Sequence, residues 1–426
     1  QRDQLIREQG RLPERTYIFE HQLTLEAAYA TLLHRKRRAL HRRVAQALEA
    51  LYPDRIETML GRLAHHWEHA GDAERAIDYL RRAGQQAASQ YANVEAVDFF
   101  TRALRLLDPG DDEQRYAILL ARERVHNLQG DRQSQDRDLT TLATLADRSA
   151  DPGRQAEIAI RRAQWAVSRS DPDAAIHASD QALTLAKLAG DINIEARSHL
   201  YRGIIGEQTF HADPDQRIHH YQEALSLARS AHLRRLEARI LREYGIWLST
   251  DPEKEGVRIL HDALRIYREI DDRVGEARVI GALSSAYMRS GDLDRARRFG
   301  DKALQFDREV GSRMEEGYVQ ATMALISVWL RRFAEARVHI EEAIRCAHET
   351  ENALIESGVH LWWTMLLDAL GDYKQADVIN DAYPTLTTEW SLIQHRVYHW
   401  VLRGQIAYHR GDPQAAVQST DRALAV

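Results

Sequence analysis

The sequence predicts an all-α fold, a right-handed solenoid of repeated helical hairpins that follows a small helical segment of different character. Three observations support this. Landmarks recur every 40 residues over most of the chain, Gly-Asp pairs separate the apolar helical stretches, and 426 residues exceed what one compact core usually holds. A solenoid satisfies all three, because its core grows with the number of repeats.

Small residues mark the repeat. Ala296, Ala336, Ala376 and Ala416 follow one another at 40-residue intervals, and each lies shortly after a turn. A small side chain at a fixed place in each hairpin lets the two helices approach closely. We therefore expect each 40-residue unit to be one hairpin that buries its apolar stripe only when neighbours stack on it.

One unit illustrates the expected elements. A first helix over Glu276–Arg289 and a second over Leu293–Arg308 are separated by Gly291 and Asp292. Glycine accepts the left-handed conformation that ends a helix, and aspartate caps the start of the next one. We expect large apolar residues to fill the space between hairpins, namely Leu283, Tyr287 and Leu304.

The spacing of Tyr287, Gly291, Ala296 and Ala303-Leu304 resembles the tetratricopeptide repeat in a 40-residue form. The resemblance extends over roughly residues 60–426, so we predict a repeat domain over 59–426 with about nine to ten hairpins. It implies partner binding on the concave face, at positions that project inward from the first helices: Gln164, Arg202, Leu241, Ser285, Leu325, Leu361, Met365 and Gln405.

These projected positions are mixed and rather apolar. They lack the Lys/Asn clamp with which some tetratricopeptide families hold a terminal carboxylate, and the asparagine ladder with which others hold an extended peptide. We therefore expect a protein partner or inducer that is larger and folded, or an architectural role.

Residues 1–58 do not fit the repeat. The string around Phe19, His21 and Glu26 resembles the end of the winged-helix subdomain in bacterial STAND signal-transduction ATPases, the group that includes NACHT and NB-ARC relatives. The resemblance implies that His21 senses the phosphates of ADP when an ATPase domain is attached. It implies ATP or ADP as cofactor of a missing upstream domain, since no phosphate-binding G-x-x-x-x-G-K-[ST] motif is present here.

A basic run, Arg35-Lys36-Arg37-Arg38 followed by Arg42-Arg43, lies in this segment. It has three interpretations: a solvated helix face, a contact to a neighbouring domain, or a nucleic-acid patch. Since the chain as a whole carries a formal charge of −6, its body would repel a phosphate backbone. We favour the first two interpretations over nucleic acid.

Composition narrows the class further. The chain is 44% hydrophobic and 29% charged, which fits a folded protein, and no apolar stretch is long enough to cross a bilayer. With one cysteine, Cys346, and no apolar leader, we expect a cytoplasmic protein without membrane contact. A start at Gln1 rather than Met suggests a piece of a longer polypeptide.

Enzymatic chemistry and metal binding are not expected of this chain. No hydrolase or metalloprotease motif occurs, and carboxylates are scattered over helix faces. His65 and His69 are four residues apart, the spacing of metal ligands on one helix face, but no distant partner is identifiable in the sequence. We predict no catalytic residue, no metal site and no cofactor held by this chain itself.

The leading hypothesis is the sensing and scaffolding arm of a STAND-type ATPase, which controls autoinhibition and assembly through contacts with a protein ligand or with its own ATPase domain. Two alternatives stay open: a freestanding tetratricopeptide adaptor, and the sensor region of a transcription regulator.

Overall fold

The structure is a computed structural model of the chain, and it describes residues 6–8, 17–19, 22–90, 92–169, 171–205, 214–249, 255–350, 352–386 and 393–425. The chain forms two compact units, Gln1–Arg122 and Glu123–Val426, each of which is described by itself. The predicted boundary after residue 58 lies inside the first unit, and it stays a prediction.

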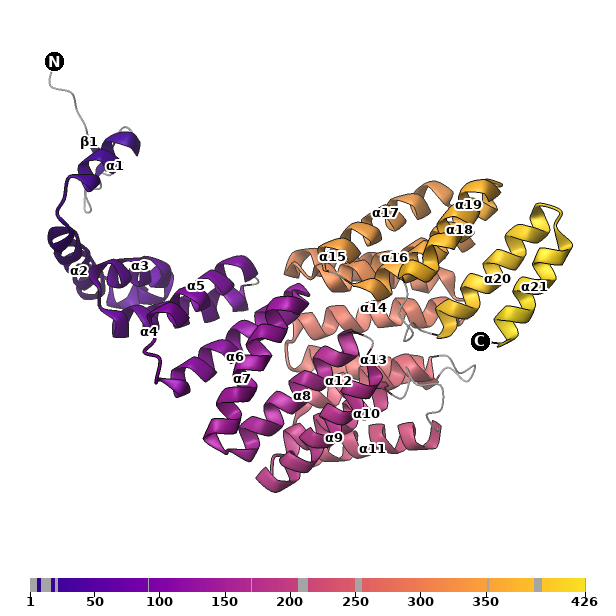
Figure 1. Cartoon of the computed structure of the whole chain (residues 1–426), viewed down its shortest axis with the longest axis horizontal. Coiled ribbons are helices and arrows are strands. Elements are labelled where there is room, and N and C mark those ends of the chain that lie inside the picture. Colours follow the sequence, from indigo (N-terminus) through magenta and orange to yellow (C-terminus); the bar gives the residue numbers. More distant parts are fainter. Residues whose placement is uncertain are drawn as a thin grey trace, which may run out of the picture. The chain divides into compact units, whose positions relative to one another are not determined.

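The first unit contains a short hairpin and a run of helices (Figure 1). Two three-residue strands pair antiparallel, with Ile6 opposite Phe19. His21 lies outside the described residues, so its predicted role is not addressed by the structure. The elements are β1 (Ile6–Glu8), β2 (Tyr17–Phe19), α1 (Gln22–Ala30), α2 (His34–Leu51), the 3-10 helix η1 (Pro53–Met59), α3 (Leu60–Ala70), α4 (Ala73–Ser89) and α5 (Asn93–Leu106).

The second unit is a succession of antiparallel helices (Figure 1). Helix α6 (Asp112–Gln129) belongs to it from Glu123 onward. The others are α7 (Arg132–Ser149), α8 (Pro152–Ser168), α9 (Pro172–Ala189), α10 (Ile192–Ile205), α11 (Pro214–Ser230), α12 (Arg234–Leu248), α13 (Glu255–Glu269), α14 (Arg273–Arg289), α15 (Leu293–Val310), α16 (Arg313–Trp329), α17 (Phe333–Glu349), α18 (Ala353–Ala369), α19 (Tyr373–Leu386), α20 (Ile393–His409) and α21 (Pro413–Ala425).

The hairpin α14–α15 confirms the expected use of the Gly-Asp pair. Gly291 has a φ of 79°, the left-handed conformation that ends α14. The side chain of Asp292 accepts a hydrogen bond from the backbone N–H of Arg295 and so caps α15. Ala296 and Ala303 are completely buried between the two helices, as their small size predicts.

Packing within the second unit identifies its inner face. The first helices of successive hairpins contact one another, from α8 to α10 and onward through α12, α14, α16, α18 and α20. In the described residues no contact of similar extent joins the second helices of successive hairpins. Helices crowd on the concave side of a curved stack and spread on the convex side. We call the surface of these first helices the inner face.

The hydrophobic core of the second unit extends along the stacked hairpins and is not confined to one compact region. A large apolar cluster joins the hairpins from α10 to α16, and Leu283, Tyr287 and Leu304 lie in it as the sequence predicts. Smaller clusters continue it toward both ends, around Ile160 and around Ile340. None of the described helices combines the length and apolar character needed to cross a bilayer.

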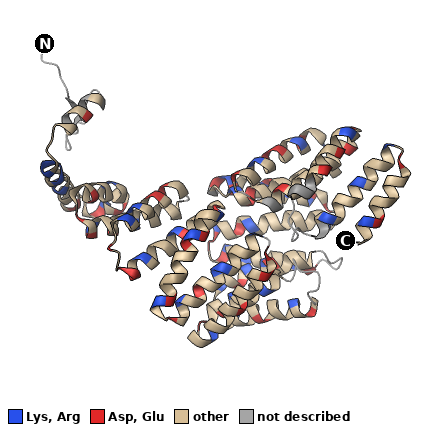
Figure 2. Cartoon of the chain, in the orientation of Figure 1, with Lys and Arg blue, Asp and Glu red and all other residues tan. Residues whose placement is uncertain are grey.

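The basic run begins α2, where blue gathers on the ribbon of the first unit (Figure 2). Most of its side chains are exposed. Arg37 Nε donates to the Leu32 carbonyl at 2.9 Å, and Arg42 lies 3.9 Å from Asp72 in the turn between α3 and α4. This arrangement fits a solvated helix face.

Candidate partner-binding face of the solenoid

Three of the predicted partner-binding residues belong to the hydrophobic core. Leu241 is 6% exposed, Leu325 is 5% exposed and Leu361 has no exposed surface. A side chain packed among core residues cannot contact a partner unless the solenoid opens. The expectation that these leucines face a ligand is therefore wrong.

The other five predicted residues reach the surface at least in part. Gln164, Arg202, Ser285 and Met365 are half-buried, and Gln405 is exposed. Two of them contact neighbouring helices: Gln405 Nε2 of α20 donates to Asp368 Oδ2 of α18 at 2.8 Å, and Arg202 Nε of α10 lies 3.5 Å from Asp180 Oδ1 of α9. The structure does not gather these residues into one cluster.

The misplacement runs along the helices. Polar side chains of the inner face lie at Glu157, Arg278 and Tyr318, each seven residues before a predicted position at Gln164, Ser285 or Leu325. Seven residues are about two helical turns, so both sets lie on nearly the same helix face. The prediction therefore lay about two turns too far toward the helix C-terminus.

Buried ion pairs link the first hairpins along the inner face. Arg161, whose side chain is 9% exposed, pairs with Glu123 of α6 and with Glu157 of its own helix at 2.6 Å. Glu157 also pairs with Arg197 of α10 at 2.8 Å. Burial raises the pKa of Glu157, but Arg197 and Arg161 outweigh it and hold the pKa below its usual range.

The series continues across the next helices. Arg239 Nη2 of α12 donates to the Tyr201 hydroxyl of α10 at 2.6 Å. On α12 itself Arg242 pairs with Glu243. Arg278 Nε of α14 then lies 2.8 Å from Glu315 Oε1 of α16. The inner face therefore carries a charged series that extends from α6 to α16.

Arginines outnumber glutamates in this series, which we call the inner arginine cluster. Its members are Arg124, Arg132, Arg161, Arg197, Arg239, Arg242 and Arg278, with Glu123, Glu157, Glu243 and Glu315. Within the described residues no carboxylate lies at ion-pair distance from Arg124, Arg132 or Arg239. The cluster is positive in a chain whose net charge is −6.

Arg124 differs from the rest of the cluster because its side chain is exposed and no hydrogen bond holds it among the described residues. Partial desolvation and the neighbouring charge of Arg161 lower the pKa of Arg124, although Glu157 and Glu123 oppose them. Its guanidinium is available to an incoming anion.

Tyr318 of α16 lies within the same electrostatic environment. It is 38% exposed, yet burial raises the pKa of its phenol, Glu315 and Glu243 raise it further, and Arg132 opposes them. A side chain that is both solvated and surrounded by protein charges is expected on a concave surface.

The second unit curves until its start meets later repeats. Arg132 Nη2 of α7 lies 3.6 Å from Met314 Sδ of α16. In the α6–α7 turn, a methyl group added to Gly130 would lie 2.9 Å from the backbone oxygen of Thr350. These contacts bring the α6–α7 turn and the start of α7 against α16 and the turn that follows α17.

The sequence contained a signal for this cluster that the projection did not use. Glu157 and Arg197 are 40 residues apart, as are Arg278 and Tyr318, so charged or polar residues recur with the period of the repeat. A search for such recurrence on the first helices would have found them. The closure by Arg132 and Met314 has no local sequence signal.

Comparison with known proteins identifies the fold of the chain but assigns it to no family. No protein-family model matches the chain. An uncharacterized protein of Rhizobium meliloti, R02095, is 37% identical over 97 residues. These residues are 22% of this chain and 9% of that protein, so the match spans a small part of a much longer relative.

Two solved structures share the fold over most of the chain. A Rap protein in complex with Competence and Sporulation Factor superimposes with a TM-score of 0.59 and 12% identity, covering 83% of this chain and 97% of that one. Aspartyl phosphate phosphatase F of Bacillus subtilis gives a TM-score of 0.51 and 11% identity, covering 82% and 93%. The chain is thus a tetratricopeptide-like helical solenoid, as predicted.

A STAND protein with a tetratricopeptide sensor from Pyrococcus horikoshii superimposes less well. Its TM-score is 0.45 at 13% identity, over 89% of this chain and 56% of that one. This likeness supports no functional assignment.

Proposed function

We propose that the second unit binds an acidic segment of a partner protein on its inner face, and that the chain serves as a protein-sensing and scaffolding arm. The observation that carries the proposal is the set of arginines without a carboxylate partner, Arg124, Arg132 and Arg239. Arg124 and Arg239 lie on the first helices α6 and α12, and Arg132, at the start of the second helix α7, reaches the same face through Met314 of α16. Repeat proteins of this fold use the concave face for binding.

The physical reason is the cost of uncompensated charge. A guanidinium withdrawn from water without a counter-charge is destabilised, and a carboxylate that reaches it forms a charge-assisted, often bidentate hydrogen bond. Arg132 is 9% exposed and satisfies its donors with neutral groups, Asn127 at 2.9 Å and Gln135 at 2.8 Å. A ligand carboxylate would replace weaker contacts with stronger ones.

A direct test uses short peptides with the complete chain. We expect a fluorescent peptide of about ten glutamates to bind with a saturable rise in anisotropy, and the affinity to fall as salt screens the charges. A lysine peptide of equal length is the control and should not bind. Equal binding of both peptides, or of neither, would contradict an acid-selective inner face.

The finer proposal is that this arm belongs to a STAND-type signalling ATPase. The string around Phe19, His21 and Glu26 supports it, as does a relative whose matched region is 9% of its length. In this scheme the arm holds an attached ATPase domain closed around ADP, and an inducer that binds the released arm better shifts the population toward exchange and assembly.

The intact mass of the polypeptide in its source cells tests this finer proposal separately from peptide binding. A mass well above the 48.9 kDa of this chain, with residues before Gln1, is expected for a sensor arm of a larger ATPase. A mass near that value leaves the freestanding adaptor. Additional residues that encode a DNA-binding domain instead of an ATPase indicate the sensor region of a transcription regulator.

A further inference from the structure

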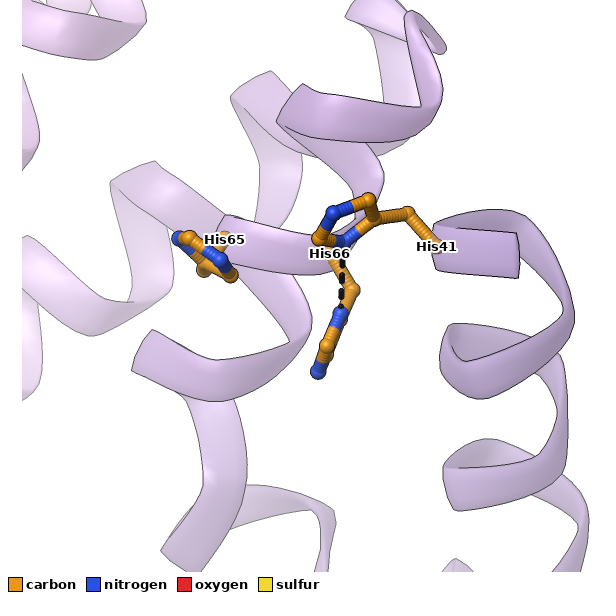
Figure 3. Close-up of side chains that lie close together, drawn as sticks. All are labelled: His41, His65 and His66. Atoms are coloured by element: carbon orange, nitrogen blue, oxygen red, sulfur yellow. Dashed lines mark hydrogen bonds between the residues drawn. The ribbon is translucent and has the colours of Figure 1, made fainter. Parts of the chain in front are cut away.

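Three histidines of the first unit come together from two helices (Figure 3). His41 of α2 reaches across to α3, where His65 and His66 are adjacent. One ring nitrogen from each lies within 4.8 Å of the others. His69 adds a fourth imidazole beside them, its ring centre 4.1 Å from that of His65 and 5.0 Å from that of His41.

Hydrogen bonds fix how the rings of His41 and His66 face each other. The Tyr29 hydroxyl lies 2.9 Å from His41 Nε2, and His41 Nδ1 lies 2.9 Å from His66 Nδ1. Two facing Nδ1 atoms at that distance share one proton. Two imidazole nitrogens bound to one tetrahedral zinc ion, each at 2.0–2.1 Å, are about 3.3 Å apart. An ion can therefore replace the shared proton with a small movement of the rings.

The third ring, His65, makes the cluster accessible from solvent. His65 is exposed, and it lines a pocket of about 640 Å³ in the first unit. Glu68, also on the pocket wall, is paired with Arg102 at 2.6 Å and is not free to act as a ligand. The donor set is therefore all imidazole. Imidazole nitrogen suits zinc and the late first-row transition ions, whereas calcium and magnesium require oxygen.

We propose that His41, His65 and His66 bind a divalent transition-metal ion of the zinc type, with a fourth position left to water or to an exogenous donor. Three protein ligands and one open position are the pattern of accessible zinc sites. The ion would join α2 to α3. His65 and His69 alone could not reveal this site in the sequence, because His41 lies on another helix.

The uncharged imidazole is the form that binds metal, and the environment favours it. Burial, followed by the neighbouring His41 and His65, lowers the pKa of His66 to about 4. Burial and His69 lower the pKa values of His41 and His65 as well. The lowered pKa values favour the neutral form of all three rings at pH 7. A metal ion that binds them therefore does not have to compete with the extra proton of a charged imidazole.

The chain supplies its own matched control. In the second unit His199 and His220 also face each other through their Nδ1 atoms, 3.0 Å apart, and exposed His219 lies beside His220. These three residues do not bring a nitrogen from every ring within 4.8 Å of the others. His65→Ala and His219→Ala thus each remove one exposed imidazole next to a histidine pair, but only the first removes a proposed ligand.

The experiment is a calorimetric titration of the complete chain with zinc chloride, repeated with cobalt to record the visible absorption of tetrahedral Co²⁺. We expect one saturable equivalent in the wild type, at least about tenfold weaker binding in His65→Ala, and unchanged binding in His219→Ala. His66→Gln should behave as His65→Ala does.

Three outcomes would overturn the proposal: no saturable binding of one equivalent, His65→Ala and His66→Gln binding as tightly as the wild type, or His219→Ala losing as much affinity as His65→Ala. Thermal melts without metal check folding. Because His65 is exposed, its replacement should leave the melting temperature of the metal-free chain unchanged.

Discussion

Arg132 and Met314 are 182 positions apart in the sequence, yet Arg132 Nη2 lies 3.6 Å from Met314 Sδ. This contact brings the start of the second unit against α16, the fifth first helix counted from α8. Arg132 and Arg161 are buried within the inner arginine cluster, and their withdrawal from water lowers the local dielectric and strengthens the charge interactions they make.

Closure of the turn predicts an unequal effect of two glycine substitutions. Gly130 and Gly291 have φ values of 78° and 79°, so alanine is strained by about 1–2 kcal/mol at either place. At Gly130 the new methyl group would also lie 2.9 Å from the Thr350 oxygen, whereas at Gly291 it meets nothing within 4 Å. We expect Gly130→Ala to lower the melting temperature more than Gly291→Ala.

Differential scanning calorimetry measures that difference under identical conditions. Gly291→Ala gives the cost of the backbone conformation alone, and the excess loss in Gly130→Ala gives the cost of parting Gly130 from Thr350. Equal losses in the two variants would mean that the closing contact contributes nothing to stability.

A buried carboxyl predicts how stability depends on pH. Asp307 of α15 is 1% exposed, and neither of its carboxylate oxygens has a hydrogen-bond partner among the described residues. Burial, with Glu315 and Glu316 adding to it, raises the pKa of Asp307 to about 8. In the unfolded chain the pKa is about 3.9, so the folded state holds one extra proton between these values.

Stability therefore falls as pH rises from about 4 to about 8, and Asp307→Asn removes this dependence because an amide does not ionise. We expect the melting temperature of the variant to exceed that of the wild type by more at pH 8 than at pH 5. Asp301→Asn, an exposed residue on the same helix, is the control. The same difference at both pH values would show that Asp307 is ionised in the folded protein.

Removing one carboxylate from the inner arginine cluster should have opposite effects on stability and on binding. Glu157 is the carboxylate partner of Arg197 and shares Arg161 with Glu123, so Glu157→Gln leaves the largely buried charge of Arg197 uncompensated, at a cost of about 3–5 kcal/mol. The same change makes the inner face more positive, and the glutamate peptide should bind more tightly.

The control for this variant is Glu335→Gln. Glu335 pairs with Arg297 at 3.0 Å, but its side chain is 44% exposed, and a surface pair contributes at most about 1 kcal/mol. Thermal melts and peptide anisotropy on both variants give the comparison. Weaker peptide binding in Glu157→Gln would place the ligand away from the cluster.

Local physics made most of the fold predictable. Gly291 and Asp292 separate two helices whatever surrounds them, and the period of Ala296, Ala336 and Ala376 reports stacking directly. The inner face was harder to predict, because Glu157 and Gln164 lie about two turns apart on one helix face, and apolar periodicity does not tell which of them makes the ion pairs. Contacts such as His41 with His66 depend on how two helices are placed in three dimensions.

The central claim is that unpaired arginines of the inner face receive an acidic ligand, and charge reversal at Arg124 tests it most directly. Arg124 and Arg337 are both exposed and have no ion pair among the described residues, but Arg337 lies on the second helix α17. We predict that Arg124→Glu weakens binding of the glutamate peptide at least about tenfold while Arg337→Glu leaves it within about twofold. Equal affinities for the two variants would contradict the account.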